Sequence, residues 1–295
     1  MAAEPIPLNP SSPGNSDPLA APRRPRMSGR NRLLFFLTAW LIVLMPFLFW
    51  WNTWFGRPLT DQKMTAYLQD EAHPRHIQHA IVQLGQRMSA GDPGAARWYG
   101  DLVRLSAHPR EEVRSTDAWV MGQDPKGPGF HEALVKMLQD PSLLVRGNAA
   151  LSLVRFGDHS GREQIVALLQ PVVVTTPYPG QVRDTAGVGT AIHQGGLVAK
   201  LQDGSQLREI RSPIGGRVRE LTALEGRRVS AGDPIATVEP EEEQVWEALR
   251  ALYLIGRPDD LPAIRYYERE LPEISDRLRQ QAMATEKAIQ ERANR

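Results

Sequence analysis

Hydrophobic and polar residues divide this chain into stretches of different periodicity. Residues 1–32 contain almost no large apolar side chains and are rich in Pro, Ser, Ala and Asn. Such a composition cannot bury enough surface to offset the entropy of ordering, so we expect a disordered tail. Apolar residues recur three and four positions apart over 59–171, which is the period of an amphipathic helix. Short β-type runs broken by Gly fill 172–240 and predict strands joined by tight turns.

The stretch 33–55 reads LLFFLTAWLIVLMPFLFWWNTWF, has no charged residue and predicts a single transmembrane helix. Its apolar run is long enough to cross a hydrocarbon core of roughly 30 Å. Trp50, Trp51 and Trp54 crowd its far end, where indole rings favour the membrane interface. A cleaved signal peptide is the alternative, but no small-residue cleavage site follows the run.

A cluster of arginines precedes this stretch and predicts its orientation. The cluster consists of Arg23, Arg24, Arg26, Arg30 and Arg32. By the positive-inside rule the N-terminus is expected in the cytoplasm and residues 56–295 across the inner (cytoplasmic) membrane, in the periplasm. The sequence leaves open whether Met27 is the true start.

The helical stretch carries an internal repeat. Helices are predicted at 60–71, 74–89, 94–107, 110–121, 128–139, 142–156 and 161–170. Apolar residues stand four and one positions before each of four glycines, Gly85, Gly122, Gly157 and Gly256. This pattern resembles HEAT repeats of the phycobilisome-lyase type, in which pairs of antiparallel helices stack into an α-solenoid. The resemblance implies a solenoid over 59–171 that resumes over 241–270, and 271–295 is expected to be a capping helix or a partner-binding extension.

The strand region contains an internal sequence duplication. The run that starts at Thr176-Pro177 is echoed at Ser212-Pro213, an offset of 36 residues. The second half resembles the biotinyl/lipoyl domain, an all-β barrel-sandwich hybrid that membrane-fusion (periplasmic adaptor) proteins share. The expected fold is therefore multidomain α + β: one transmembrane helix, an α-solenoid of HEAT-like helix pairs, and this barrel inserted at 172–240. The resemblance to adaptors also suggests a bacterial source.

The turn between the two halves argues against carrier chemistry. In a carrier domain a modified lysine occupies the hairpin tip, and here Ser205 stands at that position while Lys200 precedes the turn. No cofactor is therefore expected. Periplasmic adaptors insert a long helical hairpin at this place, whereas this chain has only a few turn residues.

Other candidate sites are outweighed by structural explanations. His73, His76 and His79 follow one another at a spacing of three, which raises a metal site. No acidic partner in a familiar motif accompanies them, so a solvated helix start is preferred. The glycines from Gly187 to Gly189 lack the strand-before, helix-after context of a phosphate loop. The acidic run Glu241–Glu243 suits a helix N-terminus without catalysis. Six aromatic residues are expected in the core or lining a groove: Trp98, Trp119, Trp246, Tyr253, Tyr266 and Tyr267.

Composition excludes several classes of function and site. A formal net charge of +1 gives no long-range attraction to nucleic acid, and the absence of cysteine excludes disulfides, thiolate metal sites and a cysteine nucleophile. No catalytic or metal-binding set is predicted. We therefore expect a non-enzymatic, membrane-anchored scaffold or adaptor. It is expected to dock protein partners that belong to a membrane complex, through the solenoid and the unmodified barrel. The alternatives are an accessory periplasmic adaptor subunit of an efflux or secretion system and a carrier-domain-related subunit of an enzyme complex; the oligomeric state is left open.

Overall fold

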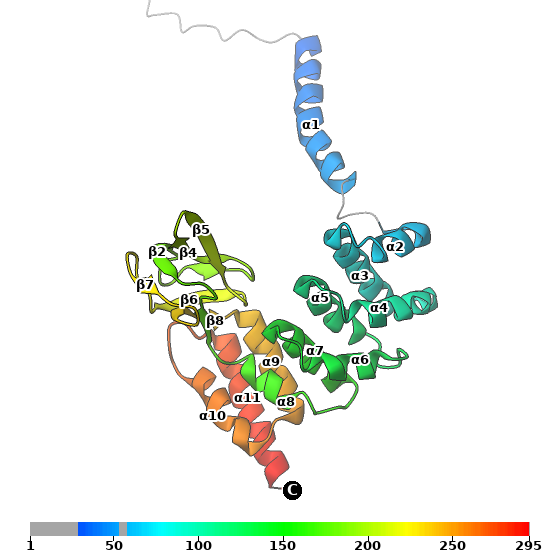
Figure 1. The fold of residues 1–295 in the computed structure, drawn as a ribbon. Helices are drawn as coiled ribbons and strands as arrows, with labels where there is room; N and C mark the ends of the chain where they lie inside the picture. Colours follow the sequence, from blue (N-terminus) through cyan, green and yellow to red (C-terminus); the bar gives the residue numbers. More distant parts are fainter. Residues whose placement is uncertain (1–28, 53–57, 295) are drawn as a thin grey trace, which may run out of the picture. The chain divides into compact units, whose positions relative to one another are not determined.

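A computed structural model describes residues 29–52 and 58–294 (Figure 1). The chain separates into two compact units, Met1–Pro58 and Leu59–Arg295. In the first unit the described element is helix α1 (Gly29–Asn52). Most of the tail predicted to be disordered lies outside the described residues, and its last four residues, 29–32, are helical.

The prediction of a transmembrane helix at 33–55 is wrong. Among the residues that the structure describes, no helix has the length and apolar character needed to cross a membrane. A span requires about 20 consecutive apolar residues. Helix α1 opens with the polar sequence Gly-Arg-Asn-Arg and ends at Asn52, and 53–55 fall outside the described part. The inner-membrane localisation and the periplasmic placement of 56–295 depended on that helix and are withdrawn with it.

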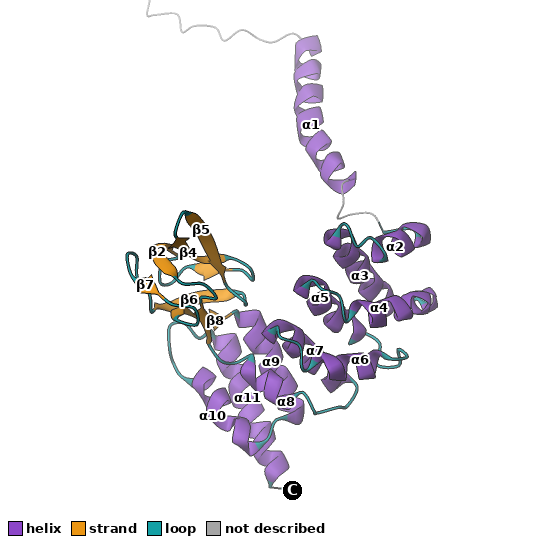
Figure 2. Cartoon of the chain, viewed as in Figure 1, coloured by secondary structure: helices purple, strands orange, loops and turns teal. Residues whose placement is uncertain are grey.

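The second unit combines helices with two small antiparallel sheets (Figure 2). Before the strands come α2 (Asp61–Leu68), α3 (Pro74–Ser89), η1 (Pro93–Trp98), α4 (Tyr99–Leu105), α5 (Glu111–Met121), α6 (Phe130–Met137), α7 (Leu143–Arg155) and α8 (Arg162–Ala167). After them come α9 (Glu242–Ile255), η2 (Pro258–Asp260), α10 (Leu261–Arg265), η3 (Tyr266–Glu268) and α11 (Asp276–Ala293).

Helix ends follow local chemistry. The side chains of Thr60, Ser142 and Ser275 each accept a hydrogen bond from a backbone N–H of the helix that follows. This supplies an acceptor for a donor that has no partner inside the helix. Pro74 occupies the first turn of α3, where its missing N–H costs nothing.

The repeated glycines lie where one helix meets the next. A Cβ added to Gly85 would lie 2.9 Å from Cγ2 of Val120 on α5, and one added to Gly256 would lie 2.7 Å from Cδ1 of Ile289 on α11. Gly122 faces Ser152 on α7 in the same way. Gly157 instead has φ +73°, a left-handed conformation that favours glycine. Three of the four glycines therefore permit close helix contact.

The strands repeat the twofold pattern of the sequence. They are β1 (Val172–Thr175), β2 (Gly180–Thr185), β3 (Ala191–Ile192), β4 (Leu197–Asp203), β5 (Gln206–Arg211), β6 (Gly216–Leu221), β7 (Arg228–Val229) and β8 (Pro234–Pro240). One sheet has the order β1-β8-β6-β3 and the other β5-β4-β2-β7. Each strand of one sheet corresponds in position to a strand of the other, so the duplicated sequence makes two equivalent sheets.

Matched hydrogen bonds support this equivalence. Gly189 N–H donates to the Val218 carbonyl at 2.7 Å, and Gly226 N–H donates to the Val182 carbonyl at 2.8 Å. The buried hydroxyls of Thr176 and Ser212 each donate to the carbonyl two residues on, at 2.7 Å in both cases.

Two separate hydrophobic cores fill the second unit. One is built from helical residues on both sides of the strand region, and the other from strand and turn residues between Val174 and Val238. Strand β1 pairs with β8, with Val172 opposite Val238, so the chain enters and leaves the strand region along neighbouring strands. This permits an insertion between α8 and α9 without separating the helices at its ends.

Candidate binding groove

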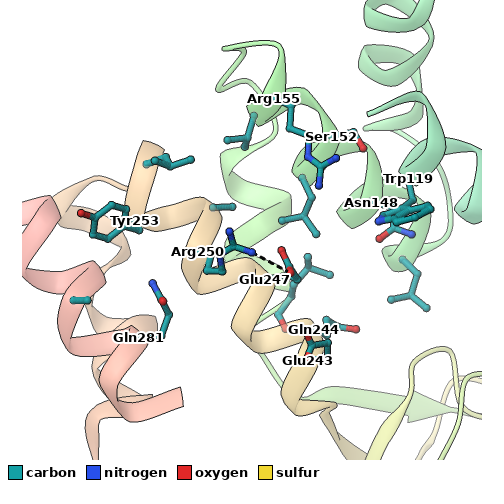
Figure 3. Close-up of a pocket in the computed structure, with 17 residues that line it drawn as sticks. Trp119, Asn148, Ser152, Arg155, Glu243, Gln244, Glu247, Arg250, Tyr253 and Gln281 are labelled. Carbon is teal, nitrogen blue, oxygen red and sulfur yellow. Dashed lines mark hydrogen bonds and ion pairs between the residues drawn. The ribbon is translucent and has the colours of Figure 1, made fainter. Parts of the chain in front are cut away.

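A groove of about 870 Å³ lies between α7 and α9 (Figure 3). Its lining comes from α5, α7, α9 and α11 and from Leu168 after α8. The apolar lining consists of Trp119, Leu144, Leu151, Val154, Leu168, Ala251, Leu254 and Ala284, together with the ring of Tyr253. Because α7 and α8 precede the strand insertion and α9 follows it, the groove brings together helices from both sides of the interruption.

Large apolar side chains remain exposed around the groove. Trp119 is 49% exposed, Tyr253 44% and Leu254 60%. Trp119 projects from the α5 side, and Tyr253 lies on the opposite side of the view, on α9 (Figure 3). Covering apolar area of this kind with another surface is favourable by about 25 cal/mol per Å² removed from water.

Polar side chains on α7 form hydrogen bonds with α5 and with the residue that follows its C-cap. Asn148 Nδ2 donates to the Ser115 carbonyl at 3.1 Å, and Ser152 Oγ donates to the Ala118 carbonyl at 2.8 Å. Arg155 Nη1 donates to Gln123 Oε1 at 3.0 Å. These donors tie α7 to α5, which holds this wall of the groove in place.

Charged groups of both signs occupy the α9 side. Arg250 Nη1 lies 3.4 Å from Glu247 Oε1, and Arg277 Nη1 lies 2.8 Å from Glu243 Oε2. The hydrogen bond from Arg277 lowers the pKa of Glu243. Both guanidinium groups also stack on Trp246, at 4.6 Å for Arg250 and 3.9 Å for Arg277. These pairs are exposed to solvent, so they contribute little to stability and remain accessible to a partner.

The six predicted aromatic residues divide between core and groove. Trp98 and Tyr267 are buried, and Trp246 and Tyr266 are partly buried against the helical core. Trp119 and Tyr253 line the groove. Periodicity predicted helices for all six but could not separate these two environments.

Ser205 lies at the exposed tip of the β4–β5 hairpin, next to Gly204 with φ +57°. Lys200 lies on β4, where its Nζ is 3.1 Å from Asp184 Oδ2. The side chain that occupies the hairpin tip is therefore a hydroxyl and not an amine.

The histidine series separates into two environments. His73 and His76 gather around Asp70, with Nδ1-to-carboxylate distances of 3.0 and 2.6 Å. His79 Nε2 instead lies 3.0 Å from Gln83 Nε2. Asp70, which follows α2, is thus the acidic partner that the sequence analysis did not identify. Its position three residues before His73 was the sequence signal that could have identified it.

The glycines at 187–189 and the acidic run play structural roles. Gly189 lies in a turn, and its N–H bonds within the strand region. Glu242 and Glu243 occupy the first turn of α9, where the helix dipole favours negative charge.

Comparisons with known proteins leave the family undetermined. No family model and no curated protein matches the chain. Similar solved structures include an engineered protein (17% identity, 78% of this chain and 80% of that one, TM-score 0.39). They also include a designed armadillo repeat protein in complex with the peptide (KR)4 (15% identity, 77% and 80%, TM-score 0.38). The urea carboxylase of Kluyveromyces lactis is 21% identical over 23% of this chain and 6% of that enzyme, with a TM-score of 0.23.

These solved structures thus include a designed armadillo repeat protein and a urea carboxylase. Their TM-scores are low, so the description of this fold depends on the elements and contacts above and not on these matches.

Proposed function

We propose that this chain is a non-enzymatic scaffold that docks a protein partner by holding an extended segment of it in the groove between α7 and α9. The observation that carries the proposal is the exposure of Trp119, Tyr253 and Leu254 around one hollow. Large aromatic and aliphatic groups held in a groove are typical anchor sites for protein partners.

The lining suggests the character of the docked segment. Apolar positions run through the groove, while carboxylates and guanidinium groups alternate on the α9 side. A segment with one or two large apolar side chains flanked by charges of both signs fits this lining. Its apolar groups would cover Trp119 and Leu254, and its charges would meet Arg250 and Glu247.

The strand region is proposed as a second docking platform. Its unmodified hairpin tip at Ser205 and the exposed Leu207 (55%) on β5 present a surface without a carrier lysine. In this proposal the chain brings two protein surfaces together and performs no chemical step itself.

Site-directed photocrosslinking tests the groove. A photoreactive phenylalanine analogue placed at Tyr253 should form a covalent adduct with one partner, and Leu254→Glu should reduce its yield at least about tenfold because it puts a charge in an apolar contact. The matched control is Val135→Glu, which puts the same charge on an exposed apolar residue of α6 that belongs to neither proposed docking surface.

Mapping of the adduct by mass spectrometry decides the outcome. A reproducible peptide with apolar anchors, lost in Leu254→Glu and kept in Val135→Glu, supports the proposal. Adducts spread over many proteins, or equal loss in both variants, contradict it.

A further inference from the structure

The turn between α2 and α3 brings three candidate metal ligands together. Asp70 follows α2, His73 is the N-cap residue of α3, and His76 lies in the first turn of α3. One potential ligand atom from each lies within 4.8 Å of the others. Among the described residues, this trio is the group that meets that geometric condition.

The Nδ1 atoms of His73 and His76 face the Asp70 carboxylate, and each of them carries either a lone pair or a proton. His76 Nδ1 is 2.6 Å from Asp70 Oδ2, and His73 Nδ1 is 3.0 Å from both carboxylate oxygens. Two unprotonated ring nitrogens would repel the carboxylate at these distances. The arrangement therefore holds either protons on both Nδ1 atoms or a cation in their place.

We propose that Asp70, His73 and His76 form a binding site for a divalent transition-metal ion, Zn²⁺ being the best fit. Imidazole nitrogen and carboxylate oxygen are both ordinary zinc ligands, with bond lengths of about 2.0–2.2 Å in tetrahedral sites. At such bond lengths, tetrahedral ligand atoms lie about 3.3 Å apart. To reach this separation, the His73 nitrogen-to-oxygen distance of 3.0 Å needs to open by about 0.3 Å and the His76 distance of 2.6 Å by about 0.7 Å.

The surroundings hold the ligands in place. The Tyr67 ring stacks on His76 with a centroid distance of 4.4 Å and an interplanar angle of 8°. Glu71, the neighbour of Asp70, is engaged elsewhere, with Arg104 at 3.1 Å and with His108 at 3.0 Å. His73 is 64% exposed, which gives an ion a path from solvent.

Three protein ligands leave a fourth position on a tetrahedral ion. A water molecule or a side chain from a partner completes the coordination there. Because the ligands come from both sides of one turn, the bound ion links the end of α2 to the start of α3.

Zinc titration of the full chain by calorimetry tests the site. We expect one equivalent of Zn²⁺ to bind, and Asp70→Asn and His76→Ala to weaken binding at least about tenfold. His131→Ala is the matched control, because His131 Nε2 also contacts a carboxylate, Asp158, at 2.8 Å but belongs to no three-ligand group among the described residues. Circular dichroism of each variant verifies that it is folded.

Cobalt substitution gives a readout that a merely structural role would not move. Tetrahedral Co²⁺ bound by two imidazoles should produce visible absorption in the wild type and in His131→Ala, and not in His76→Ala. Saturating Zn²⁺ should raise the unfolding temperature of the wild type and of His131→Ala, in which the site is intact. It should not raise the unfolding temperature of His76→Ala. The proposal is overturned if the wild type binds no stoichiometric zinc, or if His73→Ala and His76→Ala bind it as the wild type does.

Discussion

Gly122 shows how a single missing side chain determines a helix contact. Its φ of −66° suits any residue, so backbone strain does not explain the glycine. An added Cβ would lie 2.7 Å from Cβ of Ser152, whose hydroxyl bonds to the Ala118 carbonyl and so cannot move aside freely. The close contact between α5 and α7 depends on the absence of a side chain at Gly122.

Two glycine substitutions should therefore change stability in opposite directions. Gly122→Ala is expected to lower the free energy of unfolding by about 1–3 kcal/mol through overpacking. Gly100→Ala, in α4 with open space around its Cβ position, should raise it by about 0.5–1 kcal/mol because Ala is the better helix former. Urea unfolding of both variants measures this, and a shift of the same sign in both would contradict the close-contact explanation.

Asp117 is a second residue whose environment decides its chemistry. It is fully buried on α5, and neither carboxylate oxygen has a hydrogen-bond partner. Burial raises the pKa of Asp117 well above its usual range, although the charge of Arg104 acts in the opposite direction. The folded chain therefore holds this group protonated at pH values where the unfolded chain ionises it.

Asp117→Asn should remove a pH dependence of stability. A raised carboxyl pKa contributes stability that is complete below the unfolded value near 3.9 and is lost as pH rises toward the folded value. The wild type should thus lose more stability between pH 5 and pH 8 than Asp117→Asn does, measured by urea midpoints. Glu225→Gln, on an exposed turn, serves as control. Parallel pH profiles of wild type and Asp117→Asn would contradict the assignment.

At the scale of elements, the attachment of α11 depends on a pair of carboxyl groups. Desolvation, helped by a hydrogen bond with Glu286 and by its charge, raises the pKa of Glu268 on η3 to about 7. Arg265 binds Glu286 on α11 at 2.7 Å and lowers the pKa of Glu286. We therefore expect Glu268 to be protonated below a pH of about 7 and to hold η3 to α11 through Glu286.

Raising the pH through about 7 should loosen this attachment. The shift of Glu268 is upward, so its contribution is present below the unfolded pKa and disappears as pH rises through the folded one. Hydrogen exchange in α11, corrected for intrinsic rates, should be faster at pH 8 than at pH 6 in the wild type. Glu268→Gln should flatten this difference, while Glu270→Gln, a neighbouring exposed carboxylate, should not.

Helix boundaries show where local sequence suffices. The helix predicted at 74–89 is observed as Pro74–Ser89, and the one predicted at 142–156 as Leu143–Arg155, because a proline or a capping serine marks each start. The helix predicted at 94–107 is instead split into η1 and α4, with Trp98 leaving helical geometry at φ −105° and ψ 6°. Trp98 is buried in the core at this break, which periodicity did not indicate.

For the molecule as a whole, the separate cores predict that the strand region can be removed. Strands β1 and β8 are hydrogen-bonded neighbours, and the helical core takes no residue from 172–240. Replacing 172–240 with a short Gly-Ser linker should leave a cooperatively unfolding helical protein with a lower strand signal. Circular dichroism and urea unfolding measure this, and a chain without a cooperative transition would show that the helices require the strands.

What the sequence alone determined are the features that local chemistry specifies. Periodicity and turn residues predicted most helices and placed strands at 172–240. The duplication around Thr176 and Ser212 was visible in the sequence, and the structure shows it as two equivalent sheets. The same local reading failed at 33–55, where apolar composition predicted a membrane span that the described part of α1 does not provide.

Only the tertiary structure decided which residues meet. Trp119, Tyr253 and Leu254 come from helices separated by the whole strand region, so no spacing along the chain could place them around one groove. Asp117 looks like an ordinary helical aspartate until neighbouring helices cover it. The physical reason is that helical period fixes which face a residue occupies, whereas burial and contact depend on what packs against that face.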